Sequence, residues 1–394
     1  MTTPILLLNC GSSSIKYQAI DADSEEVLAS GIIQRIGEES GTLDHSIPGE
    51  VVNVRRGFPN HDRALAYLVR VFDAHGPDLT TIKAVGHRTV HGGSRFAGTT
   101  VIDDGVVEIL RELSPLAPLH NPPGIAGIEA ARKALPDIPH VAIFDTAFFA
   151  TLPPEAYTYA IDAELAAEHG IRKYGFHGTS HSFVSRKVAD VLGRPYSELN
   201  QIVCHLGNGA SVSAVRGGVA VEASMGLTPL AGLVMGTRSG DVDPGLHAFL
   251  GRELGMTLDQ VDTLLNKKSG MLGLAGVTDF RDLNELIEEG DEKAQLAMDV
   301  YCHRLLSYIG AFQAVLGHVD ALTFTAGVGE NDPLVRATVV RRLERLGFWL
   351  DEEANAVRSR VPRLISREGS PVAVLVVPTD EELAMARETL AAVG

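Results

Sequence analysis

Short apolar runs alternate with amphipathic stretches along the whole chain. Runs typical of buried strands lie at residues 5–8, 84–86, 140–144, 201–205, 321–324 and 372–377. The stretches between them carry apolar residues at helical spacing, and the longest such pattern extends from about residue 292 to residue 317. Strands that alternate with helices are typical of an α/β protein, so the pattern predicts that fold class.

Helix starts are expected where capping residues accompany proline. The sequence NPPG begins at Asn121 and NDPL begins at Asn331, and each places a capping side chain near prolines that suit a first helical turn. Another helix is expected to begin near His181, with Thr179 or Ser180 as its cap. Residues 38–54 are the least informative part of the chain.

Two distant segments share one pattern. ILLLNCGSSSIKYQAI and QIVCHLGNGASVSAV each read as an apolar strand, a glycine turn with small polar residues and a second alternating strand, with Gly11 and Gly207 about half the chain apart. Such units are common in α/β proteins, but the spacing favours an internal duplication. The length of 394 residues also favours two domains, and no linker rich in Gly, Pro or Ser separates them.

Composition excludes several classes of function. Thirty-four basic and 50 acidic residues give a formal charge of −16, the wrong sign for binding nucleic acid or an anionic membrane. The chain is 45% hydrophobic without a long apolar run, and a cytoplasmic protein is expected. Because Cys10, Cys204 and Cys302 are far apart, neither a disulfide framework nor a zinc site is expected, and all three are predicted to be packing residues.

Four glycine-rich turns carry small polar residues. They are NCGSSS at 9–14, HLGNGAS at 205–211, MGTRSGD at 235–241 and TAGVGEN at 325–331. Glycine lets backbone amides approach phosphate oxygens closely. None of the four is a P-loop, because no Gly-Lys-Ser/Thr occurs, and none completes the dinucleotide fingerprint. One such turn is usually only a turn, but the set indicates phosphate binding.

A few charged residues are candidates for the chemistry. Arg88 in VGHRTVHGG and Arg238 in MGTRSGD lie in glycine-rich turns, where a guanidinium suits carboxylate or phosphoryl oxygens; the alternative is a solvated surface charge. His177 in YGFHGTSHS is similar, its alternative being a packed or capping histidine. Asp145 ends an apolar strand, and Glu381 with Glu382 begins a helix, where carboxylates are often caps but one suffices for Mg²⁺ on a nucleotide.

Together these motifs resemble those of the acetate kinases, the acetokinase family of the actin-like, Hsp70-like and sugar-kinase superfamily. The matching segments span nearly the whole chain: LLLNCGSSSIK, VGHRTVHGG, FDTAFF, YGFHGTSH, CHLGNGAS, MGTRSGDVDPG, LNKKSG, TDFRD, TAGVGEN and PTDEEL. The resemblance implies duplicated actin-like (ribonuclease H-like) domains that flank a nucleotide cleft, and a homodimer. Residues 1–148 would form the first domain, to which 383–394 return, and residues 149–382 would form the second.

The resemblance also implies roles for individual residues. Asn9 and Glu381 would hold Mg²⁺, for which Mn²⁺ could substitute, and the turn from Gly11 to Ser14 would approach the transferred phosphoryl group or its carrier. The catalytic residues would be Asp145, His177 and Arg238, and acetate or its phosphoryl group would contact Lys16, Arg88, Val90, Leu119 and Pro229. ATP or ADP would contact His205, Leu206, Gly207, Asn208, Gly209, Asp279, Phe280, Arg281, Gly327, Val328, Gly329, Glu330 and Asn331.

The implied reaction is reversible, Mg²⁺-dependent phosphoryl transfer from ATP to acetate, giving acetyl phosphate and ADP by direct in-line transfer. An acceptor carboxylate with a pKa of about 4 is already ionised at neutral pH, so no general base is needed. Asp145 is therefore expected to orient an arginine or the waters of Mg²⁺, although the family conventionally lists this position as catalytic.

Competing functions share the fold but differ at the site. A sugar or glycerol kinase needs an aspartate base and lacks this set of motifs, and an ATPase clamp like actin needs no pair of arginines with a histidine. A propionate or butyrate kinase would differ only in pocket volume. One departure is Asp380, where the family commonly has asparagine, and its added charge could tighten Mg²⁺ binding or repel phosphates.

Overall fold

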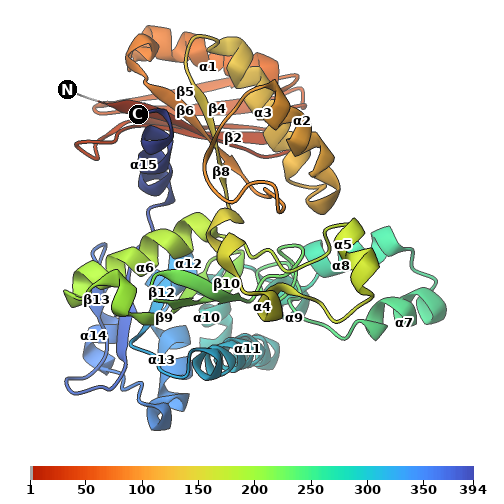
Figure 1. Cartoon of the computed structure of the whole chain (residues 1–394), viewed down its shortest axis with the longest axis vertical. Helices are drawn as coiled ribbons and strands as arrows, with labels where there is room; N and C mark the ends of the chain where they lie inside the picture. The colour runs from red at the N-terminus through yellow and green to blue at the C-terminus, as the bar shows by residue number, and fades with distance from the viewer. Residues whose placement is uncertain (1–2) are drawn as a thin grey trace. The chain divides into compact units, whose positions relative to one another are not determined.

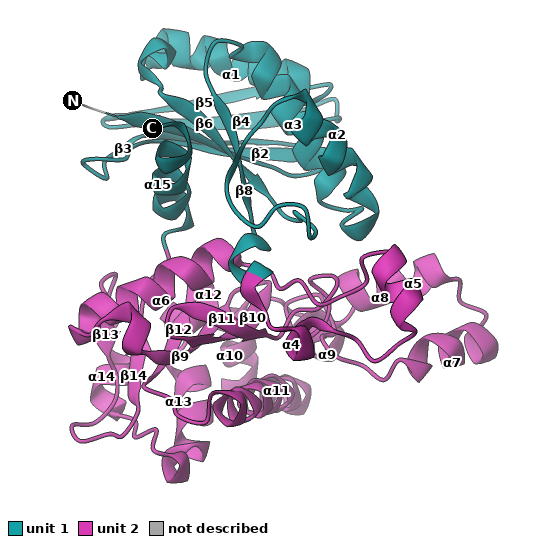
Figure 2. Cartoon of the chain, viewed as in Figure 1, with its two compact units in different colours: residues 1–150, 380–394 teal, residues 151–379 magenta. Residues whose placement is uncertain are grey.

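The apolar runs of the sequence fold into two β-sheets, one in each of two units of the chain (Figure 1 and Figure 2). The computed structural model describes residues 3–394. The first unit comprises Met1–Ala150 together with Asp380–Gly394, and the second comprises Thr151–Thr379. The segment that returns to the first unit begins at Asp380 and so carries Glu381 with it.

The sheet of the first unit has eight strands in the order β5-β4-β3-β2-β1-β6-β8-β7. Strand β1 pairs antiparallel with β2 and parallel with β6, which is parallel with β8. The carboxyl ends of β1, β6 and β8 therefore lie at one edge of the sheet. The strands are β1 Pro4–Cys10, β2 Ser14–Asp21, β3 Val27–Gln34, β4 Gly41–Ile47, β5 Glu50–Arg56, β6 Ala84–Thr89, β7 Thr100–Val101 and β8 His140–Phe144.

Helices cover both faces of this sheet (Figure 1). Helices α1 (His61–His75) and α3 (Asn121–Ala134) pack in one core with Leu6 and Leu8 of β1. Strand side chains alternate, so Leu7 and its neighbour Gly86 face the opposite side, where α15 (Glu381–Val393) packs. Gly86 permits this approach, because a Cβ there would lie 2.4 Å from Oγ1 of Thr389. The unit also contains α2 (Asp104–Glu112).

The sheet of the second unit repeats the plan of the first. Its six strands have the order β11-β10-β9-β12-β14-β13, with β9 antiparallel to β10 and parallel to β12, which is parallel to β14. The strands β10-β9-β12-β14 thus correspond to β2-β1-β6-β8, and the expected internal repeat is present. The strands are β9 Asn200–Leu206, β10 Ala210–Arg216, β11 Val219–Ala223, β12 Ala321–Thr325, β13 Arg363–Leu364 and β14 Ala373–Val376.

Helix α6 (Gly178–Leu192) packs on β9 and β12, and the long α11 (Glu292–Leu316) packs on β9 and β10. The ribbon shows α6 and α11 on opposite faces of the sheet (Figure 1). The other helices are α4 Pro154–Tyr157, α5 Ala163–Glu168, α7 Gly245–Leu254, α8 Leu258–Lys267, α9 Gly270–Ala275, α10 Phe280–Glu288, α12 Ala326–Asn331, α13 Pro333–Arg342 and α14 Glu352–Ala356.

The strands expected from apolar runs are confirmed, with ends that differ by a few residues, and the long helical pattern is α11. Both expected helix starts are confirmed, but the side chain of Asn121 is not a cap. Asn121 begins α3, but its amide is buried and exchanges hydrogen bonds with the backbone of His91, through its Nδ2 to the carbonyl (3.0 Å) and its Oδ1 from the N–H (3.3 Å). Asn331 ends α12, and Asp332, directly before Pro333, caps α13 through the N–H groups of Leu334 and Val335.

The cap expected at Thr179 or Ser180 is also wrong. Helix α6 begins at Gly178 with His177 as the N-cap residue, so both hydroxyls lie inside its first turn. The three cysteines are free thiols, and burial raises the pKa of Cys10 and of Cys302 to about 12. Within residues 3–394, no helix combines the length and the apolar character that a membrane span requires.

Candidate active site

The hairpin after β1 presents polar side chains at the carboxyl edge of the first sheet. Asn9 on β1 is the cross-strand partner of Lys16 on β2, so their side chains lie on the same face. The turn between them is closed by a hydrogen bond from the N–H of Gly11 to the carbonyl of Ser14, 2.8 Å long. The structure therefore brings these two predicted residues together.

A small cavity of about 60 Å³ lies in the first unit beside this hairpin. Its lining includes Asn9, Lys16, Arg88, Glu381 and Glu382. The hairpin contributes the first two residues, β6 contributes the arginine, and the first turn of α15 contributes both glutamates. Residues from both ends of the sequence are thus gathered because α15 returns to the first sheet.

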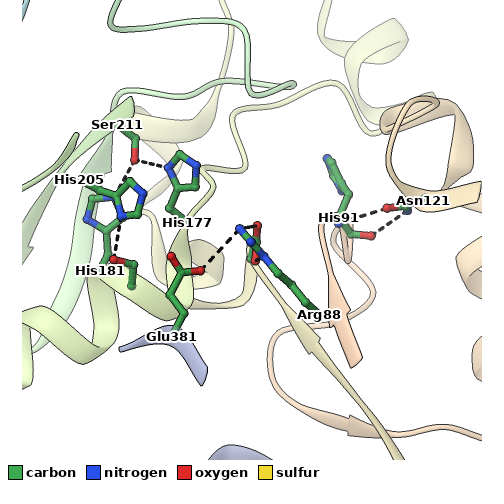
Figure 3. Close-up of polar contacts among 10 residues, drawn as sticks. Arg88, His91, Asn121, His177, His181, His205, Ser211 and Glu381 are labelled. Carbon is green, nitrogen blue, oxygen red and sulfur yellow. Dashed lines mark hydrogen bonds and ion pairs between the residues drawn. The ribbon is translucent and has the colours of Figure 1, made fainter. Parts of the chain in front are cut away.

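Arg88 at the end of β6 is held by Asp145, the residue that follows β8. Its Nε lies 3.0 Å from Oδ1 of Asp145 and its Nη2 lies 2.9 Å from Oδ2 (Figure 3 marks the contacts of Arg88). Nη2 also lies 3.6 Å from Oε2 of Glu381. The nearby Asp145 carboxylate is the main reason that the pKa of Arg88 is raised above its usual value, so the guanidinium remains charged.

Glu381 has a raised pKa in spite of its contact with Arg88. Burial is the main cause, and the negative charges of Asp145 and Glu382 add to it, while Arg88 acts in the opposite direction. The Arg88 charge is shared with Asp145, so it compensates Glu381 only in part. The three carboxylates outnumber Arg88 and Lys16, which favours a further cation beside Glu381.

Asp380, the departure from the family pattern, is the N-cap of α15. Its Oδ1 accepts a hydrogen bond of 2.9 Å from the N–H of Leu383. Aspartate and asparagine are about equally good at this position, so the substitution preserves the start of the helix that carries Glu381.

His177 occupies a strained position in the second unit. Its φ of 58° is left-handed, which is uncommon for a residue with a side chain. The imidazole stacks on His205 with a centroid distance of 4.3 Å, and its Nδ1 lies 2.9 Å from Oγ of Ser211 (Figure 3). A Cβ at Gly209 would lie 3.3 Å from His177 Nε2, so this nitrogen faces the HLGNGAS turn.

Arg238 converges on the same turn, because a Cβ at Gly209 would lie 3.6 Å from its Nη1. Nη1 donates to the carbonyl of Pro229 at 3.0 Å and contacts Sδ of Met235 at 3.6 Å. Neither partner is charged, and within residues 3–394 Arg238 forms no ion pair with a carboxylate. Burial lowers the pKa of Arg238, but an arginine keeps its proton at neutral pH. The guanidinium of Arg238 and the imidazole of His177 therefore both face Gly209, and no carboxylate among the described residues compensates the charge of the arginine.

A large cavity of about 1040 Å³ lies in the second unit. It is lined by Gly207, Asn208, Asp279, Phe280, Arg281, Gly327, Val328 and Asn331, all predicted to contact the nucleotide. His205 and Leu206 are buried in β9, and Glu330 is turned to the backbone, where its Oε1 accepts from the N–H groups of Ala326 and Thr379. Gly209 faces His177 and Arg238 instead, and Gly329 is not in the lining.

Several lining residues were not among those predicted to contact the nucleotide. They are Thr278, Asn284, Ile287, Glu288, Asp332, Pro333, Leu334 and Arg358. Helix α10 supplies three of them at helical spacing, directly after the recognised TDFRD segment, and that amphipathic periodicity was the available signal. Ser211 was also missed, although it is the last residue of the HLGNGAS turn.

The three residues expected to form the acyl pocket lie in different places. Val90 directly follows β6 and is half-buried, whereas Leu119 is 49% exposed. Pro229 belongs to the second unit, where its carbonyl receives the hydrogen bond from Arg238. None of the three lines either cavity described above.

The sequence profile of the acetokinase family matches residues 4–387. The chain belongs to this family. It is 55% identical to the acetate kinase of Leifsonia xyli subsp. xyli, in an alignment that covers 99% of both chains. It is also 55% identical to the acetate kinase of Streptomyces griseus subsp. griseus, over 99% of this chain and 96% of the relative.

Solved structures of acetokinase relatives have the same fold. The acetate kinase of Porphyromonas gingivalis superimposes with a TM-score of 0.95 over the whole of both chains at 42% identity. A propionate kinase from Francisella tularensis subsp. tularensis superimposes with a TM-score of 0.92 over 99% of both chains at 38% identity. The duplicated actin-like fold expected from the resemblance is confirmed.

Proposed function

We propose that this acetokinase is an acetate kinase, which transfers a phosphoryl group reversibly from ATP to acetate and forms acetyl phosphate and ADP. The observation that carries the proposal is the similarity to acetate kinases along almost the entire chain. The charged clusters agree with it, because Arg88 and Arg238 are partly buried cations in polar surroundings, and the exposed Lys16 lines the same cavity as Arg88.

We assign the nucleotide to the large cavity of the second unit. Its volume is sufficient for a nucleotide, and Gly207 after β9 and Gly327 in the first turn of α12 let the backbone approach phosphate oxygens without a Cβ in the way. Asn208 and Asn331 add amide groups, and the apolar side chain of Ile287 could pack on a base. ATP and ADP are therefore proposed to bind between these turns and α10.

Mg²⁺ is the metal that the family implies, and the donors in the first unit fit it. Mg²⁺ prefers oxygen ligands and retains several waters, so the amide oxygen of Asn9 and the carboxylate of Glu381 suffice, with Mn²⁺ as a substitute. Residues 3–394 contain no group of three or more His, Cys, Asp or Glu that could form a complete cage. When bound, the metal would supply charge neutralisation on the nucleotide phosphates.

The remaining residues are assigned by their side-chain chemistry, the charged ones to the carboxylate and phosphoryl oxygens and the apolar ones to the methyl group. Arg88 and Lys16 would bind the acceptor carboxylate and the phosphoryl oxygens, and Val90 would contact the methyl group of acetate together with Leu119 and Pro229. His177 and Arg238 would donate hydrogen bonds to the phosphoryl group in the transition state. Such positioning and charge stabilisation are what direct in-line phosphoryl transfer requires.

Asp145 is proposed to orient Arg88 and not to act as a base. Both of its oxygens accept hydrogen bonds from Arg88. Acetate, with a pKa of about 4 like that of an aspartate, presents no proton to remove at neutral pH. A cytoplasmic homodimer is the form that the resemblance implies, and light scattering on the purified chain tests the dimer.

A propionate kinase is the second candidate, because a solved propionate kinase has the same fold at 38% identity. The two activities differ by one methylene in the acceptor, a difference that small apolar pockets discriminate by roughly 1–3 kcal/mol. Fold similarity alone cannot separate them.

The test is a hydroxylamine assay, which traps acyl phosphates, with ATP and Mg²⁺ and with acetate, propionate, butyrate or glycerol as the acceptor. We expect rapid hydroxamate formation with acetate, slower formation with propionate, little with butyrate and none after addition of EDTA. ADP release measured in parallel reports on glycerol, which cannot form a hydroxamate. Phosphorylation of glycerol without reaction of acetate would overturn the proposal.

A further inference from the structure

A buried chain of hydroxyl and imidazole groups lies behind His177. Nδ1 of His177 is 2.9 Å from Oγ of Ser211, which is 2.8 Å from Nε2 of His181, and Nδ1 of His181 is 2.8 Å from Oγ of Ser213. Figure 3 shows Ser211 between the histidines. His181 and Ser213 are 0% exposed and Ser211 is 2% exposed, so the chain is shielded from water.

Local structure determines this alignment. His181 lies one turn after His177 in α6, and its N–H donates to the His177 carbonyl at 3.0 Å. Ser211 and Ser213 are two residues apart on β10, so both hydroxyls point to the same face of the strand. The packing of α6 beside β9 and the pairing of β9 with β10 bring the two pairs together.

Hydrogen-bond counting allows two arrangements of the protons. Burial and the nearby His205 hold the pKa of His181 well below its usual value, so this imidazole is neutral and carries one N–H. A serine hydroxyl has one proton to donate. With the Ser211 proton used within the chain, either Ser213 donates to His181, which donates to Ser211, which donates to Nδ1 of His177, or every one of these donations runs in the opposite direction.

The two directions leave different groups on the face of His177 that points to Gly209. In the first, Nε2 carries the proton and can donate; in the second, Nε2 presents a lone pair. Arg238 approaches the same turn, and a phosphoryl oxygen there would be repelled by a lone pair. We propose that His181, acting through Ser211, holds His177 in the tautomer with a proton on Nε2, so that a neutral imidazole donates to the transferred phosphoryl group.

This inference rests on the proposed phosphoryl transfer and assigns Ser211 and His181 as positioning residues. The surroundings favour a neutral donor over an imidazolium. His205 of β9 stacks on the ring, Arg238 from the loop after β11 faces Gly209 and His181 of α6 lies behind, whereas β10 contributes only hydroxyls. A second positive charge on His177 would be opposed by Arg238, and tautomer control avoids it.

The direct test is ¹⁵N NMR of the full-length chain with ¹⁵N-labelled histidine, at a pH of about 8, above the ordinary histidine pKa of about 6.5. His177→Gln identifies the His177 signals by their loss. We expect the Nε2 signal of His177 in the position of a protonated nitrogen and the Nδ1 signal in that of an unprotonated one. Protonated Nδ1 in the neutral imidazole would overturn the inference, whatever reaction the protein catalyses.

The kinetic test uses Ser211→Ala, with Ser211→Thr as the variant that keeps the hydroxyl. We expect kcat of Ser211→Ala at pH 8 to fall by about tenfold, the scale for losing a group that orients a functional histidine. Its kcat should rise at lower pH, because an imidazolium donates from Nε2 regardless of tautomer. The wild type and Ser211→Thr should stay nearly level over the same range.

Ser224→Ala is the matched control, because Ser224 is equally buried and its hydroxyl accepts from the N–H of Val212 on β10. It should leave the pH profile unchanged. Parallel pH profiles of Ser211→Ala and wild type would overturn the inference while leaving the acetate kinase proposal intact. An inactive wild type would overturn the proposed function, and the NMR measurement would still report the tautomer.

Discussion

Arg88 and Asp145 form a bidentate ion pair, in which Nε of Arg88 lies 3.0 Å from Oδ1 of Asp145 and Nη2 of Arg88 lies 2.9 Å from Oδ2. Asp145 is 3% exposed, and both of its oxygens are engaged by the guanidinium. Because both oxygens of Asp145 accept hydrogen bonds from Arg88, the carboxylate orients the guanidinium and is poorly placed to take a proton from a substrate. The predictions about these two residues follow from this contact.

Replacement of Asp145 by asparagine removes the charge and one of the two acceptors. We expect kcat of Asp145→Asn to fall by about a hundredfold, equivalent to about 2.7 kcal/mol of lost transition-state stabilisation, because Arg88 would be oriented by one acceptor and the nearby Glu381 alone. The measurement is kcat between neutral and alkaline pH, where we expect no new rise.

A steep alkaline rise in Asp145→Asn would show that hydroxide replaces a lost base and would contradict the orienting role. A chemically competent phosphoenzyme that disappears in this variant would instead make Asp145 or a neighbour a covalent carrier. Asp104→Asn is the control, since this exposed residue pairs with Arg132 at the surface.

Arg88→Lys keeps the charge of Arg88 but loses the planar fork that matches Asp145. We expect a fall in rate of at least about a hundredfold, corresponding to about 3 kcal/mol of lost transition-state stabilisation, because the lysine ammonium cannot reproduce the two parallel donors of the guanidinium. The increase in KM should be larger for acetate than for ATP. Steady-state kinetics with each substrate varied in turn checks this. Arg132→Lys is the control, because Arg132 forms an ion pair at the surface, and it should retain normal kinetics. If Arg88→Lys behaved in the same way, Arg88 would be a solvated surface charge without a role in the reaction.

Gly209→Ala tests whether His177 and Arg238 act at the HLGNGAS turn. The new methyl group would lie 3.3 Å from Nε2 of His177 and 3.6 Å from Nη1 of Arg238. We expect kcat to fall by about tenfold or more, equivalent to about 1.4 kcal/mol, while Tm changes little. An unchanged kcat in a folded variant would place the reacting phosphoryl group elsewhere.

Gly310→Ala is the matched control for Gly209→Ala. A Cβ at Gly310 would meet nothing within 4 Å, and the residue lies inside α11. We expect normal kcat and a gain in the free energy of unfolding of up to about 1 kcal/mol from the higher helix propensity of alanine.

Val90→Ala tests the acyl pocket. Val90 is half-buried and lies two residues after Arg88, at the bend that follows β6, and we propose that it contacts the methyl group of a carboxylate held by that arginine. Burial of one methylene is worth about 0.8 kcal/mol, so a larger pocket should favour propionate relative to acetate. We expect wild-type kcat/KM for acetate to exceed that for propionate by about tenfold, and the variant to narrow the ratio. If the acetate-to-propionate ratio of kcat/KM were unchanged in an active variant, Val90 would be excluded from the pocket. Val101→Ala, at an exposed valine, is the control.

Local sequence patterns predicted the elements that are buried on both sides. The strands at 140–144 and 321–324 are continuous apolar runs, and the structure buries every residue of β8 and β12. Residues 38–54 were uninformative because β4 buries Leu43 together with Gly41 and His45, which are not strongly apolar, and β5 is mostly exposed, so both strands carry little hydrophobic signal. The cap at Asn121 was wrong for a different reason, since a tertiary contact with His91 takes its side chain.

The sequence by itself determined the fold class, the repeated strand-turn-strand units and the individual polar residues at their turns, because apolar periodicity and glycine placement act within a few neighbouring residues. Only the tertiary structure decided which of those residues meet. The parallel register of β6 with β8 sets Asp145 beside Arg88, the return of α15 adds Glu381, and the packing of α6 beside β9 and β10 sets Ser211 between two histidines. These contacts depend on strand pairing and helix packing between segments far apart in the chain, for which local propensity holds no information.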